Sequence, residues 1–194
     1  MALIQHRVNK IADLKNLKSG LGAEIDLRSD VHQSGEMHLA HDAWVLGDQF
    51  SDWLMQFSHV TRGPLILNTK EDGLESRCID LMAKHKIANY FFLDTTIPTL
   101  NRLSSQGLGA HLCFRFSKYE PEEMLKLWAG RVKWLWVDCF DGDLVLPSMD
   151  LLKKFHVCLV SPELQGQSLD LISKFKETAR EVEYSVCTKR PDLW

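Results

Sequence analysis

The side chains with the clearest capacity for chemistry come early in the chain, in three short groups. They are His6 with Arg7, Glu24 with Asp26, and His41 with Asp42. Two nearby carboxylates can share a divalent cation, and histidine exchanges protons near neutral pH because its unperturbed pKa is about 6.5. Together with an arginine, these are the materials of metal-assisted phosphodiester chemistry.

The two acids belong to the segment 23–28, which the sequence predicts to be a β-strand. Side chains alternate along a strand with a period of two, so Glu24, Asp26 and Arg28 share one face, and the apolar residues share the other. Buried acids are costly without partners. We therefore expect a cation at this face, or alternatively a structural network in which Arg28 or Arg115 pairs with the acids.

Short apolar runs alternate with helical patterns along the whole sequence. The expected strands are 2–7, 23–28, 65–69, 90–94, 111–116, 134–138, 157–160 and 184–188, and the segment 38–42 either extends the second strand or returns beside it. The expected helices are 10–18, 50–59, 72–86, 96–104, 121–128, 147–154 and 168–181. This alternation predicts an α/β protein, and eight such units predict a (β/α)8 TIM barrel.

The barrel is expected to be compact, with residues 1–194 forming a single domain. Eight units leave only about 24 residues each, below the usual size of this fold. The last helix is expected to be missing, because the sequence ends at Trp194, just after the eighth strand. No glycine-rich phosphate loop follows an early strand, which disfavours a dinucleotide-binding sheet.

The composition is that of an ordinary globular protein, with 45% hydrophobic and 25% charged residues and a net charge of −3. Without a basic block, the chain is not expected to bind nucleic acid. No apolar run approaches the roughly 20 residues that span a bilayer. Five scattered cysteines without a CxxC motif are expected to be reduced thiols of the core, which favours a cytoplasmic protein. The oligomeric state is left open.

Each expected strand ends in a polar or ionisable group, and the carboxyl ends of barrel strands meet at one rim. Besides the residues above, these groups are Asn68, Lys70, Asp94, Arg115, Asp138, Glu163, Thr188 and Lys189. The pattern predicts a shared pocket, in which Arg115 and Asp138 either bind substrate or form salt bridges. Trp44 is expected to form a pocket wall, since it follows His41 and Asp42.

The order of His6-Arg7, Glu24-x-Asp26, Gly35 and His41-Asp42 resembles the glycerophosphodiester phosphodiesterase family, which belongs with the phosphatidylinositol-specific phospholipase C-like barrels. The segment 65–70 is similar to that family's Glu-x-Lys strand, with Asn68 in place of the acid.

The resemblance implies a phosphoric diester hydrolase in which His6 and His41 are the general acid and base. It implies that Glu24, Asp26 and Asn68 hold a divalent cation, Ca²⁺ or Mg²⁺. Arg7 would then clamp the phosphate and Lys70 would neutralise its charge.

The chain also departs from the family pattern. Val8 follows Arg7 where the family has glycine, Asn68 lowers the negative charge of the site, and no room remains for the family's insertion after the His-Asp motif. The expected substrate is a small phosphodiester. Two alternatives stay open: a non-catalytic module that binds a phosphorylated metabolite, and a lyase or isomerase that stabilises an enolate with Lys70 or Asp138 as base.

Overall fold

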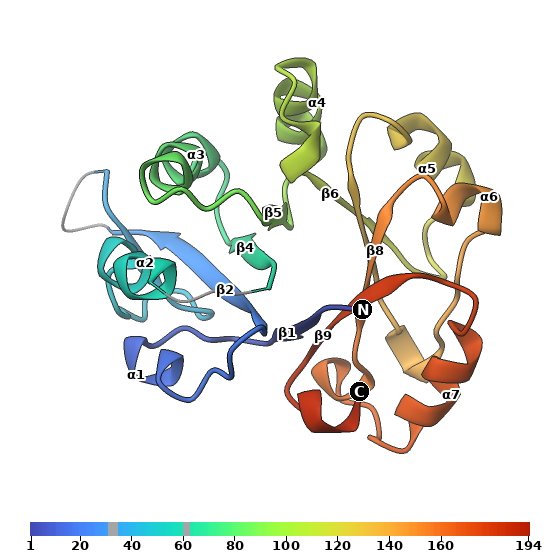
Figure 1. Ribbon diagram of the computed structural model, residues 1–194. Helices are drawn as coiled ribbons and strands as arrows, with labels where there is room; N and C mark the ends of the chain where they lie inside the picture. Colours follow the sequence, from blue (N-terminus) through green and yellow to red (C-terminus); the bar gives the residue numbers. More distant parts are fainter. Residues whose placement is uncertain (31–34, 60–62) are drawn as a thin grey trace.

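The computed structural model describes residues 1–30, 35–59 and 63–194, which form a nearly closed barrel of parallel strands surrounded by helices (Figure 1). Neighbouring strands follow the order β5-β4-β2-β1-β9-β8-β7-β6. The strands are β1 (Leu3–Gln5), β2 (Gly22–Ser29), β3 (Met37–Leu39), β4 (Leu65–Thr69), β5 (Tyr90–Leu93), β6 (Cys113–Phe116), β7 (Trp134–Val137), β8 (His156–Val160) and β9 (Tyr184–Thr188). The predicted TIM barrel is therefore confirmed.

The helices lie on the outside of this ring (Figure 1). They are α1 (Ile11–Leu14), α2 (Phe50–Ser58), α3 (Glu75–Lys84), α4 (Ile97–Ser105), α5 (Glu122–Trp128), α6 (Met149–Leu152) and α7 (Leu171–Thr178). After β9 the chain makes a 3-10 turn, Pro191–Leu193, in the place of a last α-helix. No helix within the described residues has the length and apolar character needed to cross a membrane.

Two of the expected elements take a more definite form. The segment after β2 returns beside it, because β3 pairs antiparallel with β2 and aligns His38 with Arg28. The helix expected over 10–18 is a single turn, α1. Its start is fixed by the backbone N–H of Ile11, which donates to the Asp48 carboxylate at 2.6 Å.

The two faces of the strands bury different side chains. Ile25 and Leu27 of β2 belong to the core that contains Trp53 and Phe57 of α2, so this face lies against the helices. The opposite face fills the barrel interior, with Ile4, Ile66, Phe91, Cys113, Trp134, Trp136, Cys158 and Cys187. All five cysteines are buried and free, as expected of reduced core thiols.

The barrel is joined weakly at one position. Between β5 and β6 the structure has a single isolated bridge, from Phe92 to Leu112, whereas the other neighbours are paired over several residues. The rim residues Asp94 and Arg115 come from the two strands that border this seam.

Candidate active site

Glu24 lies inside the barrel and is 1% exposed. One carboxylate oxygen accepts a hydrogen bond from the backbone N–H of Arg7 at 2.8 Å, and the other accepts one from the Asn68 amide at 3.0 Å. The imidazole Nε2 of His6 is 3.8 Å from the same carboxylate. Residues at the ends of β1 and β4 thus contact Glu24. This follows from its position on β2, which lies between these two strands, and from its side chain pointing into the barrel.

Asp26 is fully buried two residues further along β2, beside Asn68 on β4. The Nζ atom of Lys70 lies 3.0 Å from one of its oxygens, and the Nε atom of Arg7 lies 3.8 Å from the other. Asn9 holds Asp26 twice: its amide donates to the carboxylate at 2.8 Å, and its oxygen accepts from the Asp26 backbone N–H at 2.9 Å. Asn9 was not predicted from the sequence, in which its only signal is its position just after the first strand.

The alternative network, in which Arg28 or Arg115 pairs with the acids, differs from the structure, because both arginines have other partners. Arg28 lies 3.7 Å from Glu71, and its guanidinium donates to the backbone carbonyl of His41 at 2.8 Å. Arg7 has a left-handed backbone, with φ of 54°, which L-residues adopt rarely. In this turn its N–H reaches Glu24.

Burial shifts the two groups at the centre of the site in opposite directions. Burial, reinforced by the neighbouring charge of Asp26, raises the pKa of Glu24 to about 7. Burial, and then the charges of Arg7 and Lys189, lower the pKa of His6 to about 4. Both shifts oppose charge, so burial favours the neutral form of each group.

A chain of ion pairs continues from this centre around the rim. Lys70 lies 3.7 Å from Asp94, Asp94 pairs with Arg115, and Arg115 donates to Asp138 at 3.0 and 2.8 Å. The indole N–H of Trp136 also donates to Asp138, at 3.0 Å. The rim residues expected from β4 to β7 are therefore brought together.

Asp138 is held more tightly than the sequence indicated. Gln165, in the turn after β8, is the third side chain that donates to it, at 2.7 Å. Burial raises the pKa of Asp138 despite the hydrogen bonds and the charge of Arg115. Burial lowers the pKa of Arg115, but Asp138 and Asp94 together outweigh it, so that the pKa is raised overall. Gln165 has no signal in the sequence that distinguishes it from any loop amide.

His41 and Asp42 reach the rim from the loop that follows β3. The Nδ1 atom of His41 lies 2.7 Å from the Asp42 carboxylate, and this contact lowers the pKa of Asp42. The His41 side chain is about half-exposed, whereas that of His6 is mostly buried. The charge of His41 contributes to the lowered pKa of His6, so the two histidines act on each other electrostatically.

The last strand ends are tied to each other. Glu163 accepts hydrogen bonds from the hydroxyls of Ser161 and Thr188, the latter at 2.6 Å, and from the backbone N–H of Lys189 at 2.9 Å. Its carboxylate thus joins the turn after β8 to the end of β9. These groups hold the barrel rim, and Lys189 remains as a cation near His6.

The donor atoms at the centre fit a divalent cation. Asn68 Oδ1 is buried without a hydrogen-bond partner, and Asp26 Oδ1 accepts no hydrogen bond although Lys70 lies near it. Together with Glu24 these oxygens provide the hard ligands that Ca²⁺ and Mg²⁺ prefer. Within the part of the chain that the structure describes, no group of three His, Cys, Asp or Glu residues could hold a metal, so a cation bound here would need the amide oxygen of Asn68 as its third protein ligand.

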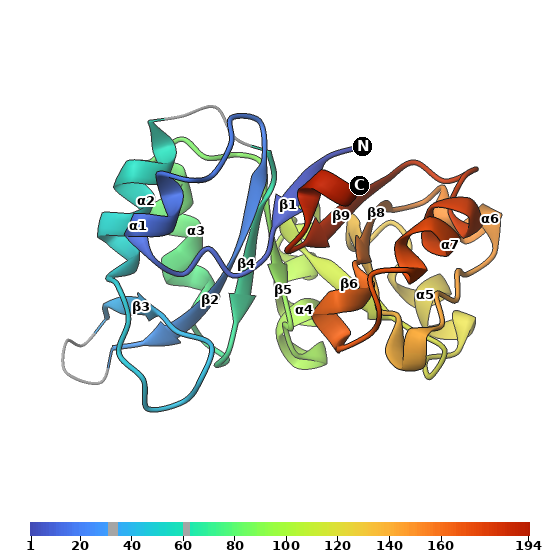
Figure 2. The same cartoon turned by 90° about the horizontal axis from the view of Figure 1, so that it is seen from below.

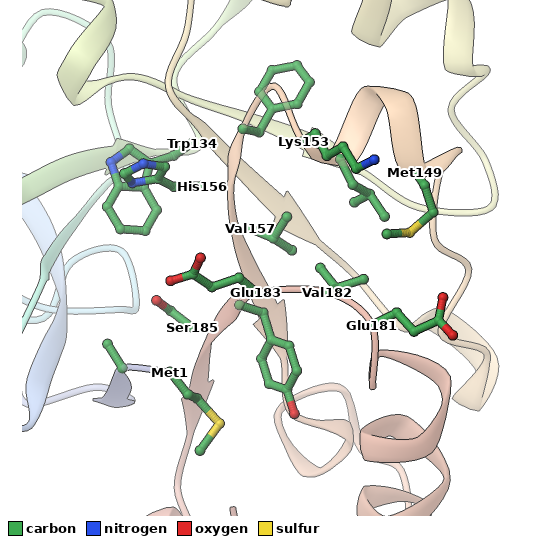
Figure 3. Close-up of a pocket in the computed structure, with 14 residues that line it drawn as sticks. Met1, Trp134, Met149, Lys153, His156, Val157, Glu181, Val182, Glu183 and Ser185 are labelled. Atoms are coloured by element: carbon green, nitrogen blue, oxygen red, sulfur yellow. The ribbon is translucent and has the colours of Figure 1, made fainter.

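A pocket larger than the one beside His6 and Arg7 lies at the other end of the barrel. Its cavity volume is about 710 Å³, and it is lined by the first residues of β7, β8 and β9, among them Trp134, His156 and Tyr184 (Figure 3). Amino ends of barrel strands serve stability, whereas chemistry gathers at the carboxyl ends. Size alone therefore does not make this hollow the active site.

Comparison with known proteins supports the fold. No protein-family model matches the chain, and no curated protein matches it by sequence. Among solved structures, a phosphodiesterase from Oleispira antarctica in complex with the product sn-glycerol-3-phosphate is 12% identical, with a TM-score of 0.74 and coverage of 100% of this chain and 95% of its own. A glycerophosphodiester phosphodiesterase from Agrobacterium tumefaciens is 12% identical, with a TM-score of 0.67 and coverage of 100% and 98%.

The fold is also similar to that of a barrel protein that is not a phosphodiesterase. The tryptophan synthase α-subunit from Pyrococcus furiosus is 10% identical, with a TM-score of 0.53 and coverage of 96% of this chain and 86% of its own. It is a less similar structure than the two phosphodiesterases by TM-score. The chain therefore has a TIM barrel fold like that of the glycerophosphodiester phosphodiesterases.

Proposed function

We propose that this protein is a metal-dependent phosphoric diester hydrolase, similar to glycerophosphodiester phosphodiesterases, that acts on a small phosphodiester. The observation that carries the proposal is the meeting of His6 with the buried pair Glu24 and Asp26 on a rim that also bears His41 and Arg7. The shared fold supports it, as does the product bound to the Oleispira antarctica enzyme, a phosphate monoester.

The surroundings of the two histidines suit different roles. The Asp42 carboxylate lies 2.7 Å from Nδ1 of His41 and fixes the orientation of its imidazole, so we assign His41 to protonate the leaving alcohol. His6 is buried, and its Nδ1 has no hydrogen-bond partner among the described residues, so His6 accepts the proton of the attacking hydroxyl. The mechanism does not depend on whether this hydroxyl comes from water or from the substrate.

The cations of the rim would bind the phosphate. The side chain of Arg7 is about half-exposed and would contact a non-bridging oxygen. Lys70 and Arg115 are already paired with acids, so their positive charges would attract the phosphate without contacting it directly. Asp138 would hold the guanidinium of Arg115 in place. Because Lys70 and Asp138 are engaged in this way, neither is a free base for enolate chemistry.

Glu24, Asp26 and Asn68 would hold a divalent cation, Ca²⁺ or Mg²⁺, through the oxygens described above. When bound, such an ion neutralises the charge that develops on the phosphoryl oxygens. Its charge would also relieve the repulsion between Glu24 and Asp26. Five free thiols in the core further favour a reducing compartment, the cytoplasm.

The test is the release of p-nitrophenol from bis(p-nitrophenyl) phosphate with Ca²⁺, Mg²⁺ or Mn²⁺ and with a chelator. We expect metal-dependent turnover that falls at least about 100-fold in His6→Gln, as loss of an acid–base group costs. His59→Gln, which changes an exposed histidine at the end of α2, is the matched control. Absence of turnover with every metal, or full turnover in His6→Gln, would refute the proposal.

Asn68 favours one second candidate, a non-catalytic module for a phosphorylated metabolite. Its amide stands where the related family has an acid, and it donates to Glu24. Such a module would bind inorganic phosphate or a phosphate monoester in calorimetry without turning over any diester. Binding that survives His41→Gln, in a protein without turnover, would favour this candidate over the hydrolase.

A further inference from the structure

The loop between β3 and α2 carries an apolar group of side chains directly beside the candidate active site. Trp44 is 98% exposed, Leu46 60% and Val45 52%. Figure 2 shows this loop extending on the side to which the arrows of β2 and β4 point, which is the carboxyl rim. Adjacent exposed apolar side chains are typical of surfaces that contact a ligand or a partner.

The loop is built to hold these side chains outward. His38 Nε2 lies 3.0 Å from the carbonyl oxygen of Val45, and Arg28 holds the carbonyl of His41. Gly47 packs so closely on the Leu39 carbonyl that a Cβ atom there would lie 1.9 Å from its oxygen. Trp44 itself has a φ of 66°, a costly conformation for a bulky residue.

Beneath these side chains is a pocket of about 330 Å³, lined by Arg28, Ser29, His38, Ala43, Trp44, Val45, Leu46 and Glu71. Its charges are matched, because Arg28 lies 3.7 Å from Glu71 and Ser29 also donates to Glu71. An ionic group would therefore find no opposite charge to spare. A single indole among aliphatic side chains also lacks the several rings of an aromatic cage for quaternary ammonium groups.

The pocket adjoins the catalytic groups through Arg28. This residue follows Asp26 by two positions on the same face of β2, a distance of about 7 Å along a strand. Its guanidinium contacts the backbone of His41, the residue assigned to the leaving alcohol. An alcohol arm extending from the phosphorus past His41 would thus enter the pocket.

We propose that Ala43, Trp44, Val45 and Leu46 form a subsite for an apolar, uncharged alcohol arm of the phosphodiester, alkyl or aryl. The inference rests on the proposed hydrolase function and specifies its substrate class. Full burial of a methylene is worth about 0.8 kcal/mol, which is about fourfold in affinity. Because this pocket is open on one side, we expect about half that energy, or about twofold for each methylene.

The test uses phosphodiesters in which one alcohol is methanol and the other is methanol, butanol, hexanol or choline. Hydrolysis of the second ester gives methyl phosphate from each of them, and ³¹P NMR detects this product. We expect kcat/KM for the hexyl ester to exceed that for the methyl ester about 30-fold, from five methylenes at about twofold each. In Trp44→Ser and Leu46→Ser this ratio should fall to about threefold or less. The matched control is Leu127→Ser on α5, a residue 65% exposed and outside the loop, which should keep the ratio.

The outcomes separate the two proposals. Turnover that does not depend on chain length, or that is highest for the choline ester, overturns the subsite and leaves the hydrolase standing. If no diester is hydrolysed, the proposed hydrolase function is refuted. The subsite is then tested by calorimetry: it predicts that the methyl hexyl diester binds about 30-fold more tightly than the dimethyl diester. Binding to phosphatidylcholine vesicles that is lost in Trp44→Ser, without chain-length dependence for the monomeric esters, would assign the loop to a lipid surface instead.

Discussion

The buried carboxylate of Asp138 should be one of the most sensitive positions of the rim. Three side chains donate to it: Arg115, Trp136 and Gln165. Replacement by leucine keeps the number and branching of the side-chain heavy atoms but removes every acceptor. In this variant Arg115 keeps its ion pair with Asp94. Arg115 and Gln165 are partly exposed, so water can accept their hydrogen bonds. The indole N–H of Trp136 is buried and is left without an acceptor. An unsatisfied buried donor costs about 1–3 kcal/mol, so with the lost ion pair we expect Asp138→Leu to cost about 3 kcal/mol.

Asp138→Asn keeps one oxygen acceptor for Trp136 and Gln165 and should cost about 1 kcal/mol. Urea unfolding followed by far-ultraviolet circular dichroism measures both. The control is Asp143→Leu, since Asp143 is an exposed partner of Lys118 and surface pairs contribute under about 1 kcal/mol. Equal losses in Asp138→Leu and Asp138→Asn, or a loss below about 1 kcal/mol in Asp138→Leu, would refute the reasoning.

The pH dependence of Asp138 has a definite sign. Its folded pKa is raised above the ordinary value of 3.8, so the folded state holds the proton more tightly than the unfolded state. The free energy of unfolding of the wild type should therefore rise relative to Asp138→Asn as the pH falls toward 3.8, and decline again as the pH rises through the folded pKa.

Three further predictions concern other parts of the molecule. Burial raises the pKa of all five thiols, so above pH 9 each thiol should lower the free energy of unfolding by about 1.4 kcal/mol per pH unit. Urea unfolding at a series of pH values should show that Cys158→Ala removes the share of one thiol, about 1.4 kcal/mol per pH unit, from this dependence. Asn68→Asp adds a third carboxylate and should tighten Ca²⁺ binding at least about tenfold in calorimetry, whereas equal affinity would argue against Asn68 as a ligand. Gly47→Ala should cost about 2 kcal/mol in thermal unfolding, because its Cβ meets the Leu39 carbonyl; an unchanged melting temperature would contradict that close packing.

The features that follow from strand periodicity were predictable from the sequence. Alternation in β2 placed Glu24 and Asp26 on the inner face, and the order of strands brought Asn68 and Lys70 beside them. The single-turn length of α1 was not predictable, because the start of that helix is set by Asp48, a residue distant in the sequence. Helical pattern alone carries no information on such an anchor.

The supporting amides of the site also escaped prediction. Asn9 and Gln165 act through hydrogen bonds to acids on other strands, and neither type nor spacing marks them. The exposure of Trp44 is a similar case. Its position after His41 predicted a pocket wall, and Trp44 does line a pocket. Its exposure depends instead on His38 and Gly47, which hold the loop in its tertiary setting.

The seam between β5 and β6 divides the chain into two nearly equal halves, each with an unbroken set of paired strands. The halves are hydrogen-bonded through β1 and β9 on one side (Figure 1). On the other side the strands share one isolated backbone bridge, and side-chain contacts such as Asp94–Arg115 and the stacked pair Phe91–Trp134 supply the rest. A polypeptide cut in the turn after α4 would leave both fragments with a complete sheet and a covered helix face. Two separately expressed fragments should therefore assemble into one barrel, and amide hydrogens along β5 and β6 should exchange before those of β2 and β8.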